Sequence, residues 1–497
     1  RAFTAGFGYY DAVALANHEL WPAGITPRTA APGSLLLTLL RGGCSRAGPV
    51  KVPLPLPGLS WWTPPWYDAL GSLPLETHRA AGGSHGLHVI LIDTHHTQYQ
   101  ELRALMNRVS EELLGEAGRF DTYCLRMEGQ QHSSLALWGS LGPPANVRGN
   151  ATLEFLDVEH GLEKGIGEVA RWTTAPEWDD ADLVAGCLPL WLCVVLFHLL
   201  PQMHFVARLN MALLQHYEAW EDLTAYWSML ASFTTSPQVA LAWTSRLGCE
   251  QVFYQLGARP AYVPSVALHI DGIKYRPMKP DVLVHRCSHK GFSQLITLLT
   301  ATAEGFNVRL DFLTRFREAG KFLTWAEIAS YKAVVFFPHV PNPMSFSELY
   351  AMSMPLFLPA EPEIWSWIWT HSDPFAGPGF PLKQLQSPID LRDIGPEWWK
   401  AAGGDSEMAP FHAFDHLKDE YSLNHFVQKA YWFQYTEFHL RPHMRSFRGC
   451  ADLLMQLQAY SADAARAESR RMAAEQLKLE IRSVSWMTQT VATLLQR

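Results

Sequence analysis

The chain has 497 residues, 48% of them hydrophobic, which is enough for two domains that each bury a core. Its 19 Trp and 25 Phe argue for an ordered globular protein. The formal net charge of −8 gives no electrostatic reason to expect a nucleic acid as the main partner, so small or neutral ligands fit better.

The seven cysteines form no CxxC pair and no Cys/His cluster at the spacing of metal ligands, which argues against a structural zinc site. Their odd number leaves at least one cysteine unpaired or bonded to another chain. One glycosylation sequon, Asn150-Ala151-Thr152, is weak evidence for the secretory route. Because the sequence starts at Arg1 rather than Met, a signal or anchor upstream would be invisible. The lumen of the secretory pathway and the cytoplasm both stay open as locations.

The first regular structure is expected after a long N-terminal segment. Residues 1–85 are rich in Pro, Gly and aromatic residues without periodicity, which predicts a loop-rich segment. Residues 88–93 predict a short buried strand, and residues 98–114 have the apolar spacing of an amphipathic helix. A strand followed by a helix is how an α/β domain begins, so we predict a Rossmann-like domain over residues 86–270. Further strands are predicted at residues 120–127, 135–141, 182–187 and 239–244, with one or two helices over 192–217 and another over 246–256.

An apolar stretch within this domain, residues 183–207, contains no Asp, Glu, Lys or Arg and is long enough to span a bilayer. It also contains two prolines, two histidines and a glutamine, which a membrane span rarely tolerates. A buried strand and helix is therefore the favoured interpretation, and a membrane-associated segment is the alternative.

A second Rossmann-like domain is predicted over residues 271–460, after a linker at residues 270–280. Its predicted strands are residues 282–285, 308–313 and 333–337, and its predicted helices are residues 292–304, 325–330, 424–435 and 443–460. Residues 361–420 lack clear periodicity and predict an insertion or lid. Residues 461–497 predict a charged C-terminal helix.

The most informative stretch is residues 332–359. A buried strand is followed by a loop, a short helix that starts near Ser345, a stop at Pro355 and a second apolar strand at residues 356–358. This order puts Ser345 and Glu348 at the carboxyl edge of a sheet, where open α/β folds bind their ligands.

Ser345, Glu348 and Pro355, with the apolar residues and Pro359 that follow, resemble the donor-binding motif of glycosyltransferases with the GT-B fold. In that family a Ser/Gly-rich loop meets a helix that carries a Glu, and the helix ends in a Gly-x-Pro turn. The resemblance implies that Glu348 accepts hydrogen bonds from the ribose hydroxyls of a nucleotide sugar, as a carboxylate can from a vicinal diol. It also implies that Ser345 and Ser347 at the helix start face the diphosphate, which unpaired helix amides bind well.

Two departures from the family pattern occur in this region. Ser353 stands where the family usually has Gly, and Asn342 lies where retaining members carry a second Glu. Retaining chemistry, and activity itself, are therefore open.

A second resemblance lies upstream, where the strand at residues 282–285 is followed by Arg286, Lys290 and Gly291. This is similar to the family's strand with an Arg and a Lys-Gly pair after it. The resemblance implies that both cations neutralise the departing diphosphate, and the alternative is that they are ordinary loop cations. His339, between the strand and Ser345, contacts the donor phosphate or simply ends a strand.

Candidate bases follow the first strand. His95 and His96 lie in the loop where inverting GT-B enzymes carry a base that faces the cleft, and His suits that task at neutral pH. Asp93 orients such a His or caps the following helix. The alternative for both histidines is a position at the surface or at the edge of the core.

The sequence therefore predicts an α/β protein with two Rossmann-like domains facing a cleft, as in the GT-B fold, with a loop-rich N-terminal segment and C-terminal helices. Residues 86–270 would bind the acceptor and residues 271–460 the nucleotide-sugar donor. Residues 441–457 resemble the family's terminal helix, which crosses back to the first domain.

The predicted function is transfer of a sugar from a nucleotide-sugar donor to an unknown acceptor, which is a glycan, a protein or a small molecule. No metal or other cofactor is required, because Arg286, Lys290 and helix amides can stabilise the diphosphate, and the DxD pattern within residues 179–182 is interpreted as a turn. The alternative is a catalytically inactive GT-B-like scaffold that binds a glycan or a protein. No nucleic-acid partner is expected, and membrane association through an anchor outside this chain stays open.

Overall fold

The computed structural model describes residues 86–93, 96–124, 169–170, 172–188, 190–210, 223–256, 260–285, 292–338, 343–360 and 435–496. These residues fall into two compact units, which divide between residues 272 and 273 and again between residues 474 and 475. We call the unit that contains residues 86–272 and 475–496 the six-stranded unit, and the unit that contains residues 273–474 the five-stranded unit.

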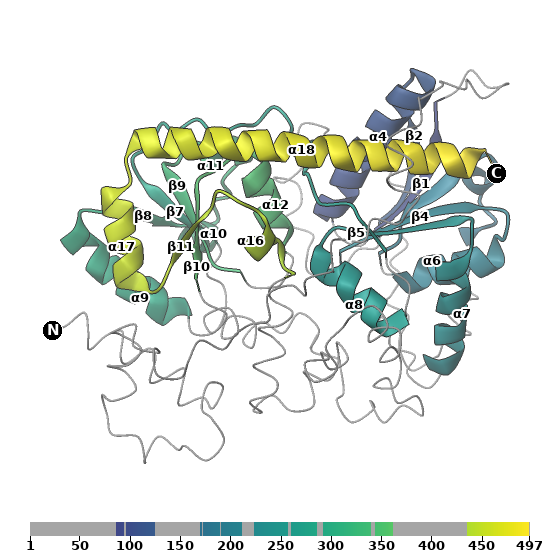
Figure 1. The fold of residues 1–497 in the computed structure, drawn as a ribbon, viewed down its shortest axis with the longest axis horizontal. Coiled ribbons are helices and arrows are strands. Elements are labelled where there is room, and N and C mark those ends of the chain that lie inside the picture. Colours follow the sequence, from purple (N-terminus) through teal and green to yellow (C-terminus); the bar gives the residue numbers. More distant parts are fainter. Residues whose placement is uncertain are drawn as a thin grey trace, which may run out of the picture. The chain divides into compact units, whose positions relative to one another are not determined.

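The six-stranded unit is a parallel sheet with helices between its strands (Figure 1). Its strands are β1 (His88–Asp93), β2 (Arg119–Cys124), β3 (Leu183–Gly186), β4 (His204–Leu209), β5 (Val239–Trp243) and β6 (Ala261–Tyr262). Its helices are α4 (His96–Leu114), the single-turn η3 (Pro176–Trp178), α6 (Leu190–Leu199), α7 (Leu223–Thr235), α8 (Arg246–Leu256) and η5 (Leu268–Ile270). All six residues of β1 are buried, as expected for a central strand covered on both faces.

The strand order of this sheet is β2-β1-β3-β4-β5-β6, and every pair is parallel. The first strand therefore lies between the second and the third, and the direction of winding reverses between β1 and β3. In open α/β sheets such a switch point, at the carboxyl ends of the strands, is where ligands bind.

The five-stranded unit repeats this design. Its strands are β7 (Val282–His285), β8 (Leu310–Phe312), β9 (Ala333–Phe336), β10 (Leu356–Pro359) and β11 (Arg445–Phe447), in the parallel order β11-β10-β9-β7-β8. Its helices are α9 (Phe292–Ala303), η6 (Glu304–Phe306), α10 (Leu313–Glu318), α11 (Trp325–Ala329), α12 (Met344–Ala351), α16 (Glu437–Leu440), α17 (Cys450–Ala459) and the start of α18 (Ala462–Leu495). The switch point lies between β7 and β9. The predicted α/β class with two parallel sheets is therefore confirmed, and it is consistent with two Rossmann-like domains.

Two predicted helices are wrong in part, because each contains a strand. Residues 192–217 were expected to be helical, but after a turn at Pro201 the chain forms β4, which pairs with β3 and β5. Residues 443–460 were also expected to be helical, but β11 precedes α17. Gly449 between them has φ +142°, a conformation that no helix contains. In both cases pairing with a neighbouring strand outweighed a helical pattern in the sequence.

The apolar stretch at residues 183–207 is a strand, a helix and most of a second strand, as the buried interpretation predicts. Its helix α6 has only ten residues. Within the described part of the chain, no helix combines the length and the apolar character needed to cross a membrane.

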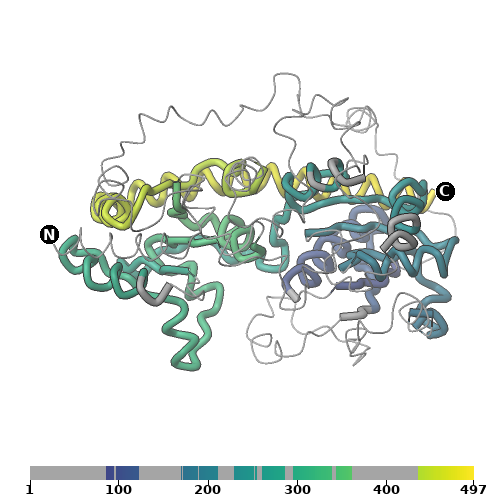
Figure 2. The backbone as a smooth tube through the Cα atoms, turned by 90° about the horizontal axis from the view of Figure 1, so that it is seen from below, coloured from purple at the N-terminus to yellow at the C-terminus, as the bar shows by residue number. Residues whose placement is uncertain are grey.

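Helix α18 belongs to both units. It runs without interruption from Ala462 to Leu495 (Figure 2). Its residue Ala465 lies in the core of the five-stranded unit, while Trp486, Met487, Val491 and Leu494 lie in the core of the six-stranded unit. The expectation that residues 441–457 form the crossing helix is wrong, because α17 packs entirely within the five-stranded core. The crossing segment is the charged helix that follows.

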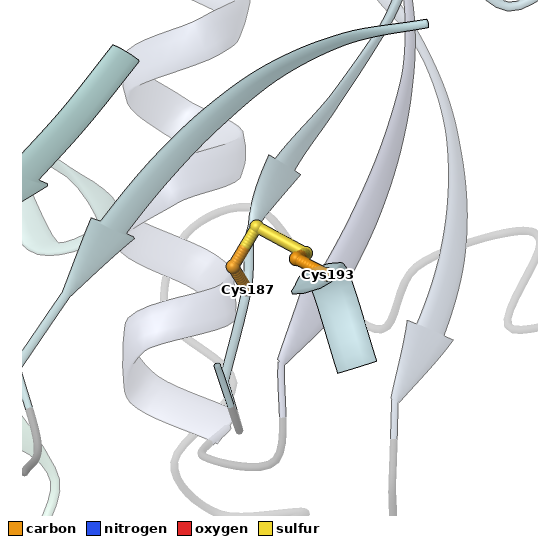
Figure 3. Close-up of a disulfide and its surroundings, with 2 residues drawn as sticks. All are labelled: Cys187 and Cys193. Carbon is orange, nitrogen blue, oxygen red and sulfur yellow. A yellow bond between two sulfur atoms is a disulfide. The ribbon is translucent and has the colours of Figure 1, made fainter. Parts of the chain in front are cut away.

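A disulfide joins Cys187, just after β3, to Cys193 in the first turn of α6 (Figure 3). Both cysteines are fully buried, and the Cys187 amide donates to the Ile92 carbonyl at 2.9 Å. The disulfide therefore ties the carboxyl end of β3 to α6, and the hydrogen bond holds it beside β1 at the switch point. Disulfides persist mainly in oxidising compartments.

The six-stranded unit contains a buried ion pair between Glu101 on α4 and Arg208 near the end of β4, with Nη2 and Oε1 at 2.8 Å. The Ser265 hydroxyl donates to Oε2 at 2.5 Å and the Val266 amide donates to Oε1 at 2.8 Å. Burial alone would raise the pKa of Glu101, but the charge of Arg208 and the Ser265 and Val266 donors together hold it below its usual value. The carboxylate therefore stays ionised and anchors the segment after β6 to α4 and β4.

We predict that Glu101→Gln lowers the free energy of unfolding by about 3–5 kcal/mol, because it leaves the buried Arg208 charge without a counter-charge. Urea denaturation measures this loss. The difference from wild type should shrink as the pH falls below the unfolded pKa of Glu, about 4.3, since a depressed carboxylate contributes its stability only above that range.

The matched control is Glu111→Gln on the same helix, where the side chain is exposed. It should change the free energy of unfolding by no more than about 0.5 kcal/mol. Equal effects of the two substitutions would contradict a special role for Glu101.

Candidate functional site

The candidate site is helix α12 with the ends of the strands beside it. Strand β9 lies in the middle of the five-stranded sheet between β7 and β10, and its carboxyl end precedes α12 in the chain. Strand β7 pairs with β9 in parallel, with His285 opposite Phe336, so both strands end at the same edge of the sheet. The predicted helix near Ser345 is confirmed, and it follows the strand that borders the switch point.

Two of the predicted donor residues share a face of α12. Ser345 and Glu348 are three residues apart, which places them on the same side of a helix. Ser345 is half-buried and its Oγ has no hydrogen-bond partner among the described residues, whereas Glu348 is only 4% exposed. Ser347 is also buried. The helix begins after Pro343, whose carbonyl accepts from the Phe346 amide at 3.0 Å.

The opposite face of α12 is held by an aromatic cluster, which we define as His285, Phe336, Phe346 and Phe438. His285 stacks on Phe336 with ring centroids 5.3 Å apart, and Phe346 lies 5.8 Å from Phe336. Phe438, from α16, meets Phe346 edge-on at 4.8 Å. The cluster fixes the first turn of α12 against the ends of β7 and β9.

Arg441 secures the same face of α12. Its guanidinium lies 4.9 Å from the centre of the Tyr350 ring and 5.8 Å from that of Phe346. Its Nε donates to Glu437 at 2.9 Å, and both side chains are buried. The Tyr350 hydroxyl donates to the Pro442 carbonyl at 3.1 Å. Phe346 and Tyr350 are each two residues from Glu348, so Arg441 holds α12 from the side away from Glu348.

Ser353 adopts the conformation that glycine favours. Its φ is +60°, its amide donates to the Tyr350 carbonyl, and the next amide, that of Met354, donates to the Leu349 carbonyl. These two bonds form the Schellman motif that ends many helices, in which the residue at this position is usually Gly. The buried Ser353 hydroxyl has no hydrogen-bond partner among the described residues. The departure from the Gly-x-Pro pattern therefore leaves the turn intact at an energetic cost.

The remaining predicted residues are described only in part. Residues Arg286, Lys290, Gly291, His339 and His95 lie outside the described residues. His96 is the first residue of α4, but its side chain is not among those described. Asp93 ends β1 at the switch point of the six-stranded sheet and is buried. The structure thus describes Ser345, Ser347 and Glu348 together on α12, and it assigns Asp93 to the other unit.

Phe438 and Arg441 were missed by the sequence analysis. Both come almost 100 residues after α12, and no local pattern connects them to it. The one signal in the sequence was Glu437, which stands four residues before Arg441.

Comparison with protein families, with curated proteins and with solved structures found no match. The function is therefore argued from the geometry of the chain and from its motifs.

We predict that Ser353→Gly is more stable than Ser353→Ala by about 1 kcal/mol. Both variants lack the buried hydroxyl, and they differ only in the Cβ that the left-handed conformation disfavours. Thermal or urea denaturation of the two variants measures this difference. An alanine variant as stable as the glycine variant would show that the backbone at this position carries no strain.

We predict that Arg441→Lys lowers the free energy of unfolding by about 1–2 kcal/mol, because an ammonium cannot cover two rings and pair with Glu437 as a planar guanidinium does. Amide hydrogen exchange in residues 346–352 should become roughly tenfold faster. The matched control is Arg445→Lys, which alters an Arg–Glu–Tyr contact elsewhere in the same unit. That control should leave the exchange of α12 unchanged, and equal exchange in both variants would contradict local anchoring by Arg441.

Proposed function

We propose that the chain is a glycosyltransferase of the GT-B type, which binds a nucleotide sugar on the five-stranded unit and transfers the sugar to an acceptor. The observation that supports this most is the shared face of Ser345 and Glu348 on α12, directly after the strand that borders the switch point. A Schellman turn at Ser353, before Pro355 and β10, adds the shape expected of the donor motif.

The donor contacts follow from this placement. In the proposed complex Glu348 accepts hydrogen bonds from the ribose hydroxyls, and its low exposure strengthens them because little water competes. The first amides of α12 and the hydroxyl of Ser345 receive the diphosphate. Arg286, Lys290, Gly291 and His339 belong to the same donor site in this proposal.

The reaction itself is a displacement at the anomeric carbon of the sugar. A base removes the proton of the acceptor hydroxyl, the acceptor oxygen bonds to the anomeric carbon, and the bond from that carbon to the diphosphate oxygen breaks. His95 and His96 are the proposed bases, with Asp93 as the group that orients them. Arg286, Lys290 and the α12 amides stabilise the charge that develops on the diphosphate, so the proposed mechanism requires no metal.

We predict that Glu348→Gln weakens binding of the cognate nucleotide sugar by about tenfold to a hundredfold. This loss of affinity corresponds to the free energy that hydrogen bonds to a charged carboxylate contribute. Calorimetry with a panel of nucleotide sugars identifies the donor and measures the change. A donor that lacks the ribose hydroxyls should bind wild type as weakly as the complete donor binds Glu348→Gln. Because the contact is then already absent, Glu348→Gln should not weaken the binding of this truncated donor any further.

The matched control is Glu327→Gln, which alters a partly exposed acid that caps α11 in the same unit and should not change donor affinity. Failure of wild type to bind any nucleotide sugar would sink the enzyme proposal and favour a scaffold that binds a glycan or a protein. Binding without turnover would identify an inactive scaffold that keeps its donor site.

A further inference from the structure

His88 is the first residue of β1, at the amino-terminal edge of the six-stranded sheet. Its side chain is 6% exposed, and Nε2 of the ring lies 2.8 Å from Oδ2 of Asp121 on β2. The other ring nitrogen, Nδ1, lies 3.0 Å from the carbonyl oxygen of Asp180 and 3.2 Å from Oδ1 of the same residue, in the segment that leads into β3. One imidazole ring therefore connects β1 both with β2 and with the segment before β3.

The partners of His88 decide which form of the ring fits between them. A carbonyl oxygen and an ionised carboxylate only accept hydrogen bonds, whereas a neutral imidazole has a single N–H group. A neutral His88 can therefore donate to Asp121 or to Asp180, and its other nitrogen then faces an acceptor without a proton between them. The imidazolium form has an N–H group on each nitrogen and donates to both partners. The contacts therefore favour the protonated ring.

The charges around His88 act in the same direction. Asp182 accepts from the His88 amide at 2.7 Å and is the third carboxylate in contact with this residue. Arg119 on β2 pairs with Asp180 at 2.8 Å and lies 3.6 Å from Asp121. Three carboxylates thus share one guanidinium, so a positive charge on the imidazole brings the group closer to neutrality. We define these five residues as the His88 cluster.

Strand β2 depends on the His88 cluster because it lies at the edge of the described sheet. Its backbone pairs with β1 alone, whereas β1 and β3 each pair with two strands. Helix α4 packs on the opposite face of the sheet, against Val89 and Leu91, and its Arg103 lies 6.0 Å from the centre of the Phe120 ring. Because neighbouring residues of a strand face opposite sides, this cation belongs to the face that His88 does not share. The His88 cluster is therefore the polar connection of β2 on its own face.

We propose that the His88 cluster is a pH-sensitive latch that holds β2 in the sheet. The protonated ring ties β1 to β2 and to the segment before β3. A ring that has lost its proton keeps only one of these hydrogen bonds, and the Asp121 side chain, which is 8% exposed, loses the positive charge beside it. Strand β2 then opens more readily from the edge of the sheet.

The direction of the pH dependence follows from which state holds the proton. The closed strand binds the proton of the ring more tightly than the open strand does. The latch therefore contributes fully below about pH 6.5, where a histidine in an unfolded chain is protonated, and its contribution is lost as the pH rises above that range. The latch does not depend on the proposed donor site.

Amide hydrogen exchange of the full wild-type chain tests the proposal, once the rates are corrected for intrinsic exchange at each pH. The equilibrium constant for opening of residues 119–124 should be about tenfold larger at about pH 8.5 than at about pH 5.5, which is the lower end of what a hydrogen bond to a charged group contributes. Strand β5 is the internal control, because its sequence VALAW contains no titratable group. It should change much less. No change in β2, or an equal change in β2 and β5, would overturn the proposal.

Two substitutions test the role of the ring itself. His88→Gln keeps an amide donor for Asp121 but cannot titrate, so the opening of β2 should become nearly the same at both pH values. Asp121→Asn keeps the ring and offers a partner that can donate as well as accept, so it should reduce the pH response. Thermal denaturation checks that both variants fold.

The matched control is His198→Gln, which replaces an exposed histidine on α6 of the same unit, where Nε2 lies 3.3 Å from the Met229 carbonyl oxygen. This variant should keep the full pH response of β2. A response that persists in His88→Gln, that is unchanged in Asp121→Asn, or that disappears in His198→Gln would overturn the latch.

Discussion

Parallel pairing of the described strands is the constraint on which the candidate site depends. Successive parallel strands cannot be joined by a tight turn, so each connection crosses back over the sheet and all carboxyl ends gather at one edge. In each sheet the first strand lies between the second and the third, which opens a switch point at that edge. Asp93 lies at this edge in one unit, and α12 follows it in the other. The topology of each sheet, rather than the sequence around these residues, therefore places Asp93 and α12 where ligands bind.

Within each unit, buried polar contacts hold the part of α18 that belongs to that unit. In the six-stranded unit, Glu101 and Arg208 fix residues 264–266, whose carbonyls accept from Gln476 and Ser483 of α18 at 2.8 and 3.1 Å. In the five-stranded unit, Glu468 of α18 accepts from the Arg445 Nε at 2.9 Å and from the Tyr460 hydroxyl at 3.0 Å. A buried charge is costly without its partner, so within each unit these contacts fix the part of α18 that belongs to it. One continuous helix thereby depends on two separate sets of polar contacts.

The sequence could predict those features whose signals are local. Buried apolar runs gave β1, β7 and β9, and the Pro and hydroxyl residues around 343–355 gave α12 and the start of β10, because backbone preference and burial agree there. Strand β4 could not be predicted from its own residues, since its pairing with β3 and β5 decides its conformation. The same holds for the Cys187–Cys193 bond and for the contacts of Arg441 with α12. A shared face for Ser345 and Glu348 follows from helical spacing once the bounds of α12 are known.

The conformation of Ser353 bears on the proposed donor motif. A residue other than Gly at the left-handed position costs about 1 kcal/mol, and the buried hydroxyl adds to that cost. The turn nevertheless keeps both of its hydrogen bonds, and β10 follows it in register with β9. Arg441 and the aromatic cluster hold the face of α12 away from Glu348, and they supply packing that can offset a strained C-terminus. A serine at this position therefore argues for a less stable helix end, and it does not by itself argue against the proposed donor site on the other face.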